Sequence, residues 1–393
     1  MKIVFTLASL GSGGAERVVS LLANKMAEQG HQVEIICLKF NDVYYKLHPE
    51  VKVTLAMQQT KNRLTEVFWL RKYVKQEKPD VVIAFTEGVY CFTIAALLGT
   101  KIPVIASERL DPSAMTWKRN LLKRLLLPYA DWLVVQTKTI KDYFPKSIQK
   151  KTSIIFNPVN KKVSLTPSPS PKGEGNYAEK GKLNRIISVA RLYPQKNQEM
   201  MIRAFAKIAD KYPDWQLVIY GEGPLRAQLE ALVSSSSHSE AAKPSVKFFT
   251  EQSGKAERSE RVLLPGRTEK VIDELQKSKI FCLSSDYEGM SNSMIEAICV
   301  GLPVVSTKVS GTDELIQDGV NGLLVDIGDE QGMTDALEKL IQDSKLMKKM
   351  GDSNLTSRSL LMPGTRVKAS ELQGPLWLLR LIFLLVPKFS GRI

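Results

Sequence analysis

The first forty residues constrain the fold of this chain more than any other stretch. Residues 2–8 form a continuous apolar run, the turn GSGG follows at 11–14, and residues 16–29 carry apolar side chains at helical spacing. Gly30 ends this segment, and residues 33–38 form the next strand-like run. A strand, a helix and a strand in this order predict a parallel, doubly wound α/β sheet.

The second half of the chain begins the same series again. Residues 185–190 form a strand-like run, 198–211 an amphipathic helix and 215–220 another strand. At 393 residues the chain is long for a single core, so we expect two α/β domains. Further buried strands are predicted at 80–85, 103–107, 132–136, 154–159, 280–284 and 303–306.

Shifts in composition place the domain boundaries. We expect a first domain at 1–160, a linker or insert rich in Pro, Ser, Gly and Lys at 161–182, and a second domain at 183–355. Within the second domain, 234–260 is low in core-forming residues and is predicted to be a surface insertion or a disordered loop. The tail 356–393 is atypical, and its apolar run is predicted either to anchor on a membrane surface or to form a buried terminal helix.

The charge balance favours an anionic partner. Lys and Arg number 55 against 41 Asp and Glu, a formal net charge of +14, which suits a membrane face, a lipid diphosphate or a nucleotide. No nucleic-acid-binding motif accompanies this charge, so we expect no nucleic-acid partner. The four cysteines lie in apolar runs without metal-like spacing, and no run of 18 apolar residues occurs, so we expect a reduced, cytoplasmic chain without a spanning helix.

One amphipathic segment leaves two interpretations open. Residues 117–126, WKRNLLKRLL, place Trp and Leu side chains against four Lys and Arg side chains. We expect a helix whose apolar face packs on the protein while its basic face is solvated. The alternative is a helix that rests on a membrane surface.

The glycine turn resembles a dinucleotide-binding fingerprint only in part. Gly11 and Gly13 match the first two positions of GxGxxG, but Glu16 occupies the third. We therefore do not expect a nicotinamide cofactor. A glycine-rich turn at a helix start still lets a phosphate or a sugar approach the backbone closely, and a simple tight turn is the alternative.

Two acids and two cations in the second half form a candidate site. Glu288 lies beside Gly289 in a predicted loop, and Glu296 follows eight positions later inside a predicted buried helix, 291–300. Two acids in this arrangement could bind one polar ligand at two points. The alternative is that Glu288 is solvated and Glu296 caps the helix or pairs with a nearby residue. Arg191 and Lys196 follow the first strand of the same half and form a plausible diphosphate clamp.

An ordered set of motifs resembles the family 4 retaining glycosyltransferases. That family has the GT-B architecture, an α/β fold of two facing Rossmann-like domains with an interdomain cleft for the nucleotide sugar. The segment SERLDP resembles a branch that adds hexosamines, notably N-acetylgalactosamine, to polyprenyl-diphosphate glycans or exopolysaccharide precursors. The motifs are GSGGAER at Gly11, NPV at Asn157, VARLYPQKN at Val189, GEGP at Gly221, LLPGR at Leu263, EGMSNSMIEA at Glu288, GLPVVST at Gly301 and GTDELIQDGVNGLLV at Gly311.

The resemblance implies a role for each matching residue. Arg191 and Lys196 would neutralise the donor diphosphate, and Glu288 would accept hydroxyls of the transferred sugar; these three form the implied catalytic set. Glu296 would accept from the ribose. The remaining implied binding residues are Gly13 and Gly14 for phosphates or acceptor, Gly266 and Arg267 near the base, and the backbone of Gly289, Met290, Ser291 and Asn292 for sugar or phosphate.

The chain departs from the family pattern in its first domain. Many members carry a histidine near the reacting carbon, whereas Glu108 and Arg109 occupy that neighbourhood here. We expect these two residues to bind substrate, with a structural ion pair beside a strand end as the alternative. The resemblance implies neither a metal nor another cofactor, since two cations can do the work of a magnesium ion.

The expected function is therefore transfer of a sugar, with retention, to a lipid-linked or polysaccharide acceptor. The donor would be a UDP-hexose or UDP-N-acetylhexosamine, and the enzyme would work in the cytoplasm, peripheral on the inner face of the plasma membrane. The two inserts and the atypical tail leave open an alternative, a degenerate relative that binds a nucleotide sugar or glycan without catalysis.

Overall fold

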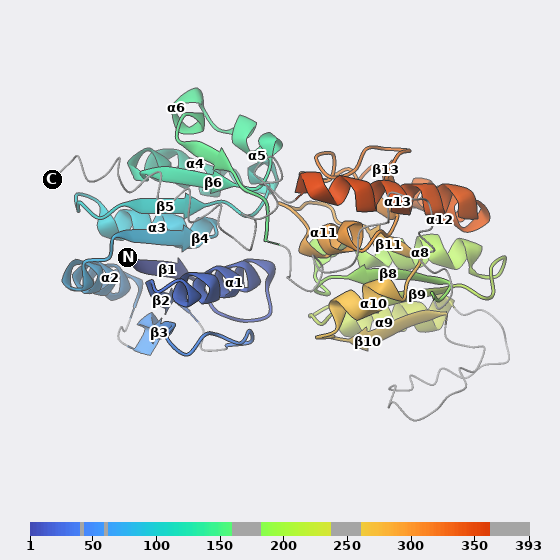
Figure 1. Ribbon diagram of the computed structural model, residues 1–393, viewed down its shortest axis with the longest axis horizontal. Helices are drawn as coiled ribbons and strands as arrows, with labels where there is room; N and C mark the ends of the chain where they lie inside the picture. The colour runs from blue at the N-terminus through green and yellow to red at the C-terminus, as the bar shows by residue number, and fades with distance from the viewer. Residues whose placement is uncertain (40–42, 59–61, 159–181, 237–260, 362–393) are drawn as a thin grey trace. The chain divides into compact units, whose positions relative to one another are not determined.

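The structure, a computed structural model, describes residues 1–39, 43–58, 62–158, 182–236 and 261–361. These residues form two compact units, one within Met1–Pro158 and one within Val159–Met362. The tail from 362 onward and almost all of the predicted linker and insert lie outside the described residues. Figure 1 shows one α/β layer arrangement in each unit.

The first unit contains a sheet of seven parallel strands in the order β3-β2-β1-β4-β5-β6-β7. Helix α1 packs on one face of this sheet, and α2 and α3 pack on the other. The strands are β1 Lys2–Leu7, β2 Gln32–Cys37, β3 Lys52–Leu55, β4 Val81–Phe85, β5 Val104–Ser107, β6 Trp132–Val135 and β7 Thr152–Ile154. The helices are α1 Gly14–Glu28, α2 Arg63–Glu77, α3 Glu87–Leu97, α4 Trp117–Leu126, α5 Lys138–Tyr143 and α6 Lys146–Gln149.

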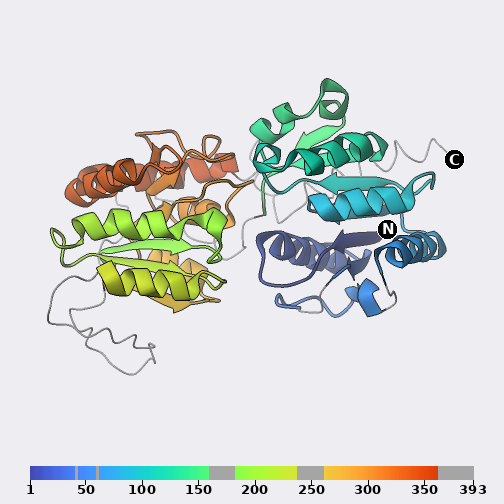
Figure 2. The ribbon, with the colours of Figure 1, turned by 180° about the vertical axis from the view of Figure 1, so that it is seen from behind.

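The second unit contains six parallel strands in the order β10-β9-β8-β11-β12-β13. Helices α8, α9 and α12 build the core on one face, and Figure 2 shows α8 and α9 in front of the sheet. The strands are β8 Arg185–Val189, β9 Gln216–Tyr220, β10 Val262–Gly266, β11 Ile280–Leu283, β12 Val304–Thr307 and β13 Gly322–Val325. The helices are α8 Gln198–Ala209, α9 Arg226–Ser236, α10 Val271–Gln276, α11 Asn292–Cys299, α12 Glu330–Gln342 and α13 Ser344–Leu361.

The predicted pair of parallel, doubly wound sheets is confirmed. In the first sheet, β2 and β3 are added on one side of β1, and β4 to β7 are added on its other side, so the strand order reverses between β1 and β4. In the second sheet it reverses in the same way between β8 and β11. Loops diverge from the carboxyl ends of the two strands at such a point and leave a crevice where ligands bind in this class of fold. Gly13 and Gly14 follow β1, Arg191 and Lys196 follow β8, and Glu288 follows β11, so these candidate residues lie at the two switch points.

Five elements differ from the sequence-based expectation. The strand predicted at 154–159 is β7, Thr152–Ile154, because only these residues pair with β6. After β13 the chain forms two helices, α12 and α13, and α13 continues to Leu361, beyond the domain end expected at 355. Strand β3 and helix α2 were not predicted.

The orientation of α4 is opposite to the expectation. Lys123, which was expected on a solvated basic face, is buried and forms an ion pair with Glu108. Trp117, Leu121 and Leu125, which were expected to pack on the protein, are exposed. Two of its four cations, Arg119 and Lys123, pair with buried acids on the inner side, while Trp117, Leu121, Leu122 and Leu125 are exposed and Leu126 packs against the core.

Candidate functional site

The second unit places two loops side by side at the carboxyl edge of its sheet. The loop after β8 ends in a 3-10 turn, Pro194–Lys196, and Asn197 adopts a left-handed conformation with φ 43°. The Asn197 side chain then accepts a hydrogen bond from the Met200 amide and so caps α8. The loop after β11 ends at Ser291, whose hydroxyl accepts from the Met294 amide at 3.3 Å and caps α11. Both loops are therefore anchored by helix caps.

Hydrogen bonds tie these two loops to each other. The Asp286 amide donates to the Gln195 carbonyl at 2.9 Å, and the Asn197 side-chain amide donates to the Asp286 carboxylate at 2.9 Å. The Ser284 hydroxyl donates to the Lys196 carbonyl at 2.9 Å. The position of Lys196 is therefore fixed by residues that lie about ninety positions later in the chain.

Lys196 and Glu288 form the centre of this site. The Lys196 ammonium group forms an ion pair with Glu288 Oε1, and the Ser285 hydroxyl donates to the same oxygen at 2.7 Å. Both charged side chains are largely withdrawn from solvent. The structure thus brings together one predicted cation and one predicted acid that the sequence separates.

Arg191 lies on the same loop but is exposed. Its guanidinium group lies 4.9 Å from the centre of the Tyr193 ring, and its carbonyl accepts from the Gln198 side chain at 2.9 Å. A guanidinium group held over a ring keeps its planar donors directed along the loop surface. A contact between Arg191 and a diphosphate remains a prediction.

The second acid, Glu296, is helix-borne as predicted. It lies in α11 and is buried, whereas Glu288 lies in the preceding loop. Gly289, Met290 and Ser291 are buried between the two acids, and α11 begins at the half-buried Asn292. The Met294 amide of the first helical turn is bound by the Ser291 cap, and binding of sugar or phosphate by the backbone of residues 289–292 remains a prediction.

A glycine turn that the sequence did not mark as functional supports the Lys196 loop. The turn after β9 contains Gly223, and a Cβ atom there would lie 2.3 Å from the carbonyl oxygen of Leu192. The Leu192 amide in turn donates to the Glu222 carbonyl at 2.9 Å. The signal was the GEGP motif, whose glycines permit this close backbone approach.

Gly266 is the last residue of β10, and Arg267 follows it at the same edge. Gly266 has a φ of +88°, which favours glycine, and its carbonyl accepts from the Gly221 amide at 2.8 Å. Arg267 is exposed. A position near the nucleotide base remains a prediction for both residues.

In the first unit, the glycine turn is covered by an acid. Gly13 is the N-cap of α1, and a Cβ atom there would lie 2.0 Å from the Glu16 carboxylate. A carboxylate at the helix start occupies the place where the amides of Gly14 and its neighbours would favour an anion. This placement opposes phosphate binding at Gly13 and Gly14 and is compatible with a hydroxyl.

Glu108 is held by a buried ion pair, as the structural alternative supposed. Its carboxylate lies 2.7 Å from the Lys123 ammonium group, and each side chain is only 1% exposed. Tyr90 donates to the same carboxylate at 2.8 Å, and burial together with Glu108 raises the pKa of Tyr90. The partner is Lys123 rather than Arg109, and a substrate contact of Glu108 remains a prediction.

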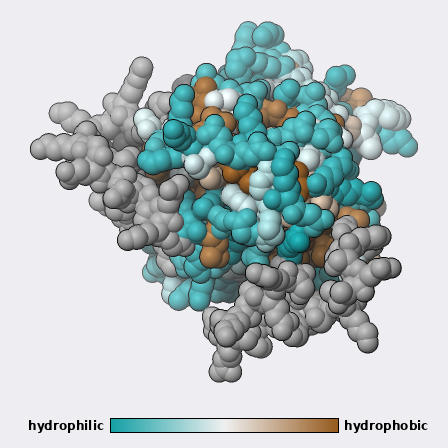
Figure 3. All heavy atoms as spheres, turned by 90° about the vertical axis from the view of Figure 1, so that its right-hand side faces the viewer, coloured by the Kyte–Doolittle hydropathy of each residue, from teal (hydrophilic) through white to brown (hydrophobic). Residues whose placement is uncertain are grey.

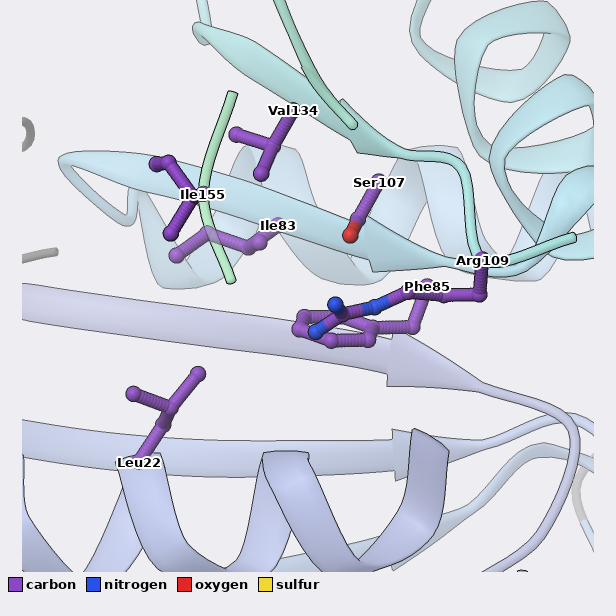
Figure 4. A pocket seen from close by; sticks show the side chains of 7 residues that line it. All are labelled: Leu22, Ile83, Phe85, Ser107, Arg109, Val134 and Ile155. Carbon is purple, nitrogen blue, oxygen red and sulfur yellow. The ribbon is translucent and has the colours of Figure 1, made fainter. Parts of the chain in front are cut away.

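Arg109 lies in a different environment from its neighbour. Its guanidinium group lies 4.6 Å from the centre of the Phe85 ring, above a small, mainly apolar pocket lined by Ile83, Val134 and others (Figure 4). It donates to Asn157 Oδ1 at 2.8 Å. Burial lowers the pKa of Arg109 from 12.5 to about 9, and the nearby Glu108 carboxylate offsets only part of the cost of removing the cation from water.

Asn157 is a second residue whose role the sequence did not indicate. Its Oδ1 atom also accepts from the buried Gln136 side chain at 2.7 Å, and Gln136 follows β6. Asn157, which lies after β7, is thus held by Gln136 at the end of β6 and in turn orients the Arg109 guanidinium group. The NPV motif was the only signal, since it marked Asn157 without a role.

The described residues show neither a metal cluster nor a membrane-spanning helix. No group of three or more His, Cys, Asp or Glu side chains among them is arranged to hold a metal ion. Within the same residues, no helix is both long and apolar enough to cross a bilayer. The four cysteines are buried and free.

Sequence comparison assigns the chain to a class of enzyme. Residues 172–355 match the family described as glycosyl transferases group 1, and residues 12–163 match glycosyltransferase family 4. A relative from Campylobacter jejuni is 30% identical over 361 residues, which cover 89% of this chain and 91% of the relative. The chain therefore belongs to the family 4 glycosyltransferases and is a sugar-transferring enzyme.

The similar proteins are named for related reactions. The Campylobacter jejuni relative is a GalNAc-alpha-(1->4)-GalNAc-alpha-(1->3)-diNAcBac-PP-undecaprenol alpha-1,4-N-acetyl-D-galactosaminyltransferase. A second relative from that organism, N-acetylgalactosamine-N,N'-diacetylbacillosaminyl-diphospho-undecaprenol 4-alpha-N-acetylgalactosaminyltransferase, is 29% identical, covering 88% of this chain and 92% of its own. Anabaena HepE in complex with UDP and glucose has a TM-score of 0.72 at 18% identity, covering 92% of this chain and 95% of its own. The last similarity confirms the GT-B fold.

Proposed function

We propose that this enzyme transfers an N-acetylhexosamine or a hexose from a UDP donor, with retention at the anomeric carbon, to a polyprenyl-diphosphate-linked or polysaccharide acceptor. The observation that carries this proposal is the Lys196–Glu288 ion pair on two interlocked loops at the switch point of the second sheet. The names of the Campylobacter relatives support an acceptor linked to undecaprenol through a diphosphate. Such an acceptor would place the enzyme at the inner face of the plasma membrane.

Donor binding would break the Lys196–Glu288 ion pair, and each of the two side chains would then contact a different part of the nucleotide sugar. The ammonium group of Lys196 would turn to the diphosphate, and the Glu288 carboxylate would accept from hydroxyls of the sugar. Because both groups are already desolvated and positioned, the donor replaces one set of charge contacts with another. Glu296 would accept from the ribose, and the loop of Gly266 and Arg267 would lie near the base.

The chemical step would be assisted mainly by electrostatics. As the bond between the anomeric carbon and the diphosphate breaks, negative charge develops on the leaving phosphate oxygen. Lys196, Arg191 and the amino end of α11 would stabilise this charge without a metal ion. Glu288 binds and orients the sugar in this scheme and transfers no proton.

The acceptor would contact the first unit. The Glu16 carboxylate beside Gly13 favours a hydroxyl over a phosphate at the glycine turn. Arg109, whose guanidinium group donates to Asn157 and lies over the Phe85 ring, would instead attract an anionic part of the acceptor. The acceptor diphosphate is such a group.

A screen followed by a transfer assay tests the proposal. UDP-N-acetylgalactosamine, UDP-N-acetylglucosamine, UDP-galactose and UDP-glucose are each added to the full chain, and the melting temperature is measured, because a bound donor raises it by mass action. The stabilising donor is then incubated with short-chain polyprenyl-diphosphate glycans, and the anomeric configuration of the product is read by NMR. Stabilisation without transfer to any acceptor would indicate the degenerate, binding-only relative, and an inverted product would contradict retention.

A further inference from the structure

Helix α4 exposes most of its large apolar side chains, and two of its cations form ion pairs on the inner side. The Lys123 ammonium group lies 2.7 Å from Glu108, and the Arg119 Nε atom donates to Glu87 at 2.7 Å. Both acids are buried and belong to the elements beneath the helix. The rotation of α4 about its own axis is therefore fixed by charge pairing, since breaking a buried pair leaves an uncompensated charge.

The outer side of α4 carries large apolar residues. Trp117 is 70% exposed and Leu125 is 60% exposed, and Leu121 and Leu122 are exposed as well. Tyr129, which follows the helix, is also exposed. We call these five residues the α4 patch. Apolar residues gathered in this way on a protein surface mark a site of interaction.

Helix α2, which packs against α3, also exposes apolar residues. Leu64 and Phe68 lie one helical turn apart on α2 and are strongly exposed. Helices α2 and α3 pack on the same face of the first sheet, and Figure 2 shows α3 and α4 in front of that sheet. The face of the second unit shown in Figure 3 is mainly hydrophilic by contrast, with scattered hydrophobic residues.

Cations accompany the α4 patch. Lys118 and Arg124 are exposed on the same helix, whose sequence contains no Asp or Glu. The Lys118 ammonium group lies 5.7 Å from the centre of the Trp117 ring. Tryptophan and tyrosine favour the level of the lipid headgroups, and cations near them attract anionic lipids.

We infer that the α4 patch docks the enzyme on an anionic phospholipid bilayer. Apolar side chains would enter the boundary between headgroups and acyl chains, and Lys118 and Arg124 would contact the headgroup phosphates. A second copy of this chain fits less well, because a symmetric contact through α4 would bring Lys118 and Arg124 of both copies together. This inference rests on the proposed function, for which it supplies the partner surface.

The patch also lies close to the acceptor residues along the chain. Arg109 follows β5 at the carboxyl edge of the sheet, and α4 begins eight residues later at Trp117. A bilayer held at α4 would keep the headgroup end of a lipid-linked acceptor near that edge. Docking would therefore raise the local concentration of an acceptor that cannot leave the membrane.

Vesicle sedimentation with the full chain tests the inference. The vesicles contain phosphatidylcholine with or without about one-third phosphatidylglycerol, and we expect binding to the anionic vesicles that weakens as salt is added. The variant L121Q/L125Q should bind at least about tenfold less well. The variant K118Q/R124Q should bind about 25-fold less well, since each cation near an anionic surface contributes about fivefold.

A matched control and two further measurements separate the possible outcomes. The control L183Q/I327Q changes two similarly exposed apolar residues of the second unit and should bind like the parent. Unchanged binding of L121Q/L125Q, or a parent that ignores anionic vesicles, overturns the inference. A dimer that L121Q/L125Q dissociates would assign the patch to a second copy and overturn it as well.

Transfer to a water-soluble acceptor analogue distinguishes this inference from the proposed function. L121Q/L125Q should retain that transfer and lose only its preference for acceptor embedded in vesicles. If the parent performs no transfer to any acceptor, the proposed function fails, while vesicle binding still decides the role of the α4 patch.

Discussion

Lys196 shows how a single side chain depends on distant parts of the sequence. Its backbone is held by the Ser284 hydroxyl, and its ammonium group is held by Glu288. Both partners come from the loop after β11, and the neighbouring Asn197 binds Asp286 of that loop. Such a network fixes the backbone of Lys196 before the substrate arrives, so that only the side chain has to turn to the diphosphate, and a cation held this close favours electrostatic stabilisation of a transition state.

Replacement of this residue gives the first prediction. We expect Lys196→Ala to lower kcat by about 10²–10³-fold, the loss seen when one preorganised group that faces developing charge is removed. The measurement is transfer from the UDP donor at saturating concentration, with circular dichroism to show that the variant is folded. Lys207→Ala, which removes an exposed lysine of α8 that pairs with Glu330, should leave kcat unchanged. Parent-like turnover by Lys196→Ala would remove this residue from the mechanism.

Arg109 gives a prediction in which stability and activity move in opposite directions. The pKa of Arg109 is about 9 in the folded chain and 12.5 in the unfolded chain, so the unfolded chain binds the proton more tightly. The charge on Arg109 therefore lowers the free energy of unfolding, and this cost is complete at every pH below about 9. Arg109→Met removes this cost. We expect the melting temperature at pH 7 to rise by about 2–4 °C, the shift for about 1 kcal/mol in a unit of this size, while transfer falls.

The pH dependence provides the check on this argument. The stability gained by Arg109→Met should be complete below pH 9 and should shrink as the pH rises above that value, because the parent then loses its buried charge. Calorimetry at pH 7 and pH 10 measures both values. A lower melting temperature for the variant at pH 7 would mean that the contacts with Phe85 and Asn157 outweigh the desolvation cost.

At the scale of elements, the glycine turn after β9 acts as a support for the loop after β8. Gly223→Ala would place a Cβ atom 2.3 Å from the Leu192 carbonyl oxygen, and neither backbone can yield without moving the loop. We expect a loss of about 1–3 kcal/mol in the free energy of unfolding, together with weaker donor binding. Chemical denaturation and a titration with UDP measure the two effects.

A second glycine provides the control. Gly88 in the first turn of α3 has open space around its Cα atom, so Gly88→Ala should be neutral or stabilising. Normal donor affinity in a destabilised Gly223→Ala variant would show that the turn supports the fold but not the site.

The strands and helices could be predicted where their sequence pattern is strong. Central parallel strands such as β1 and β4 are buried on both faces and therefore read as continuous apolar runs. Strand β3 lies at the sheet edge and is half-exposed, so its four residues lack that pattern. The type of fold follows from the strong elements alone, because the order of strands and helices was clear without β3.

The orientation of α4 and the contacts of the site could not be predicted in the same way. Helical periodicity separates the apolar residues from the basic ones, but it does not tell which side faces inward. That choice depends on Glu87 and Glu108, which lie on other elements. Likewise, the spacing of Glu288 and Glu296 placed one acid in a loop and one in a helix, whereas the Lys196 contact arises only when β8 and β11 pair.

At the scale of the whole molecule, the two units divide the proposed work. The predicted donor contacts, among them Lys196, Arg191 and Glu288, belong to the second unit, and Arg109 and the α4 patch belong to the first. The cations of the second unit would supply the charge that a metal supplies in other sugar transferases. A bound donor should therefore stabilise the second unit directly.

Hydrogen exchange with mass spectrometry tests this division. A UDP donor at about 100 times its Kd stabilises the state that binds it by about 2.7 kcal/mol, which corresponds to about 100-fold slower exchange through opening of that state. We expect this protection in peptides from β8, the Lys196 loop and α11, and much smaller changes in β1 to β4. The protection should persist in excess EDTA and should be lost in Lys196→Ala. Equal protection of the strands of both units, or its loss in EDTA, would contradict a metal-independent donor site confined to the second unit.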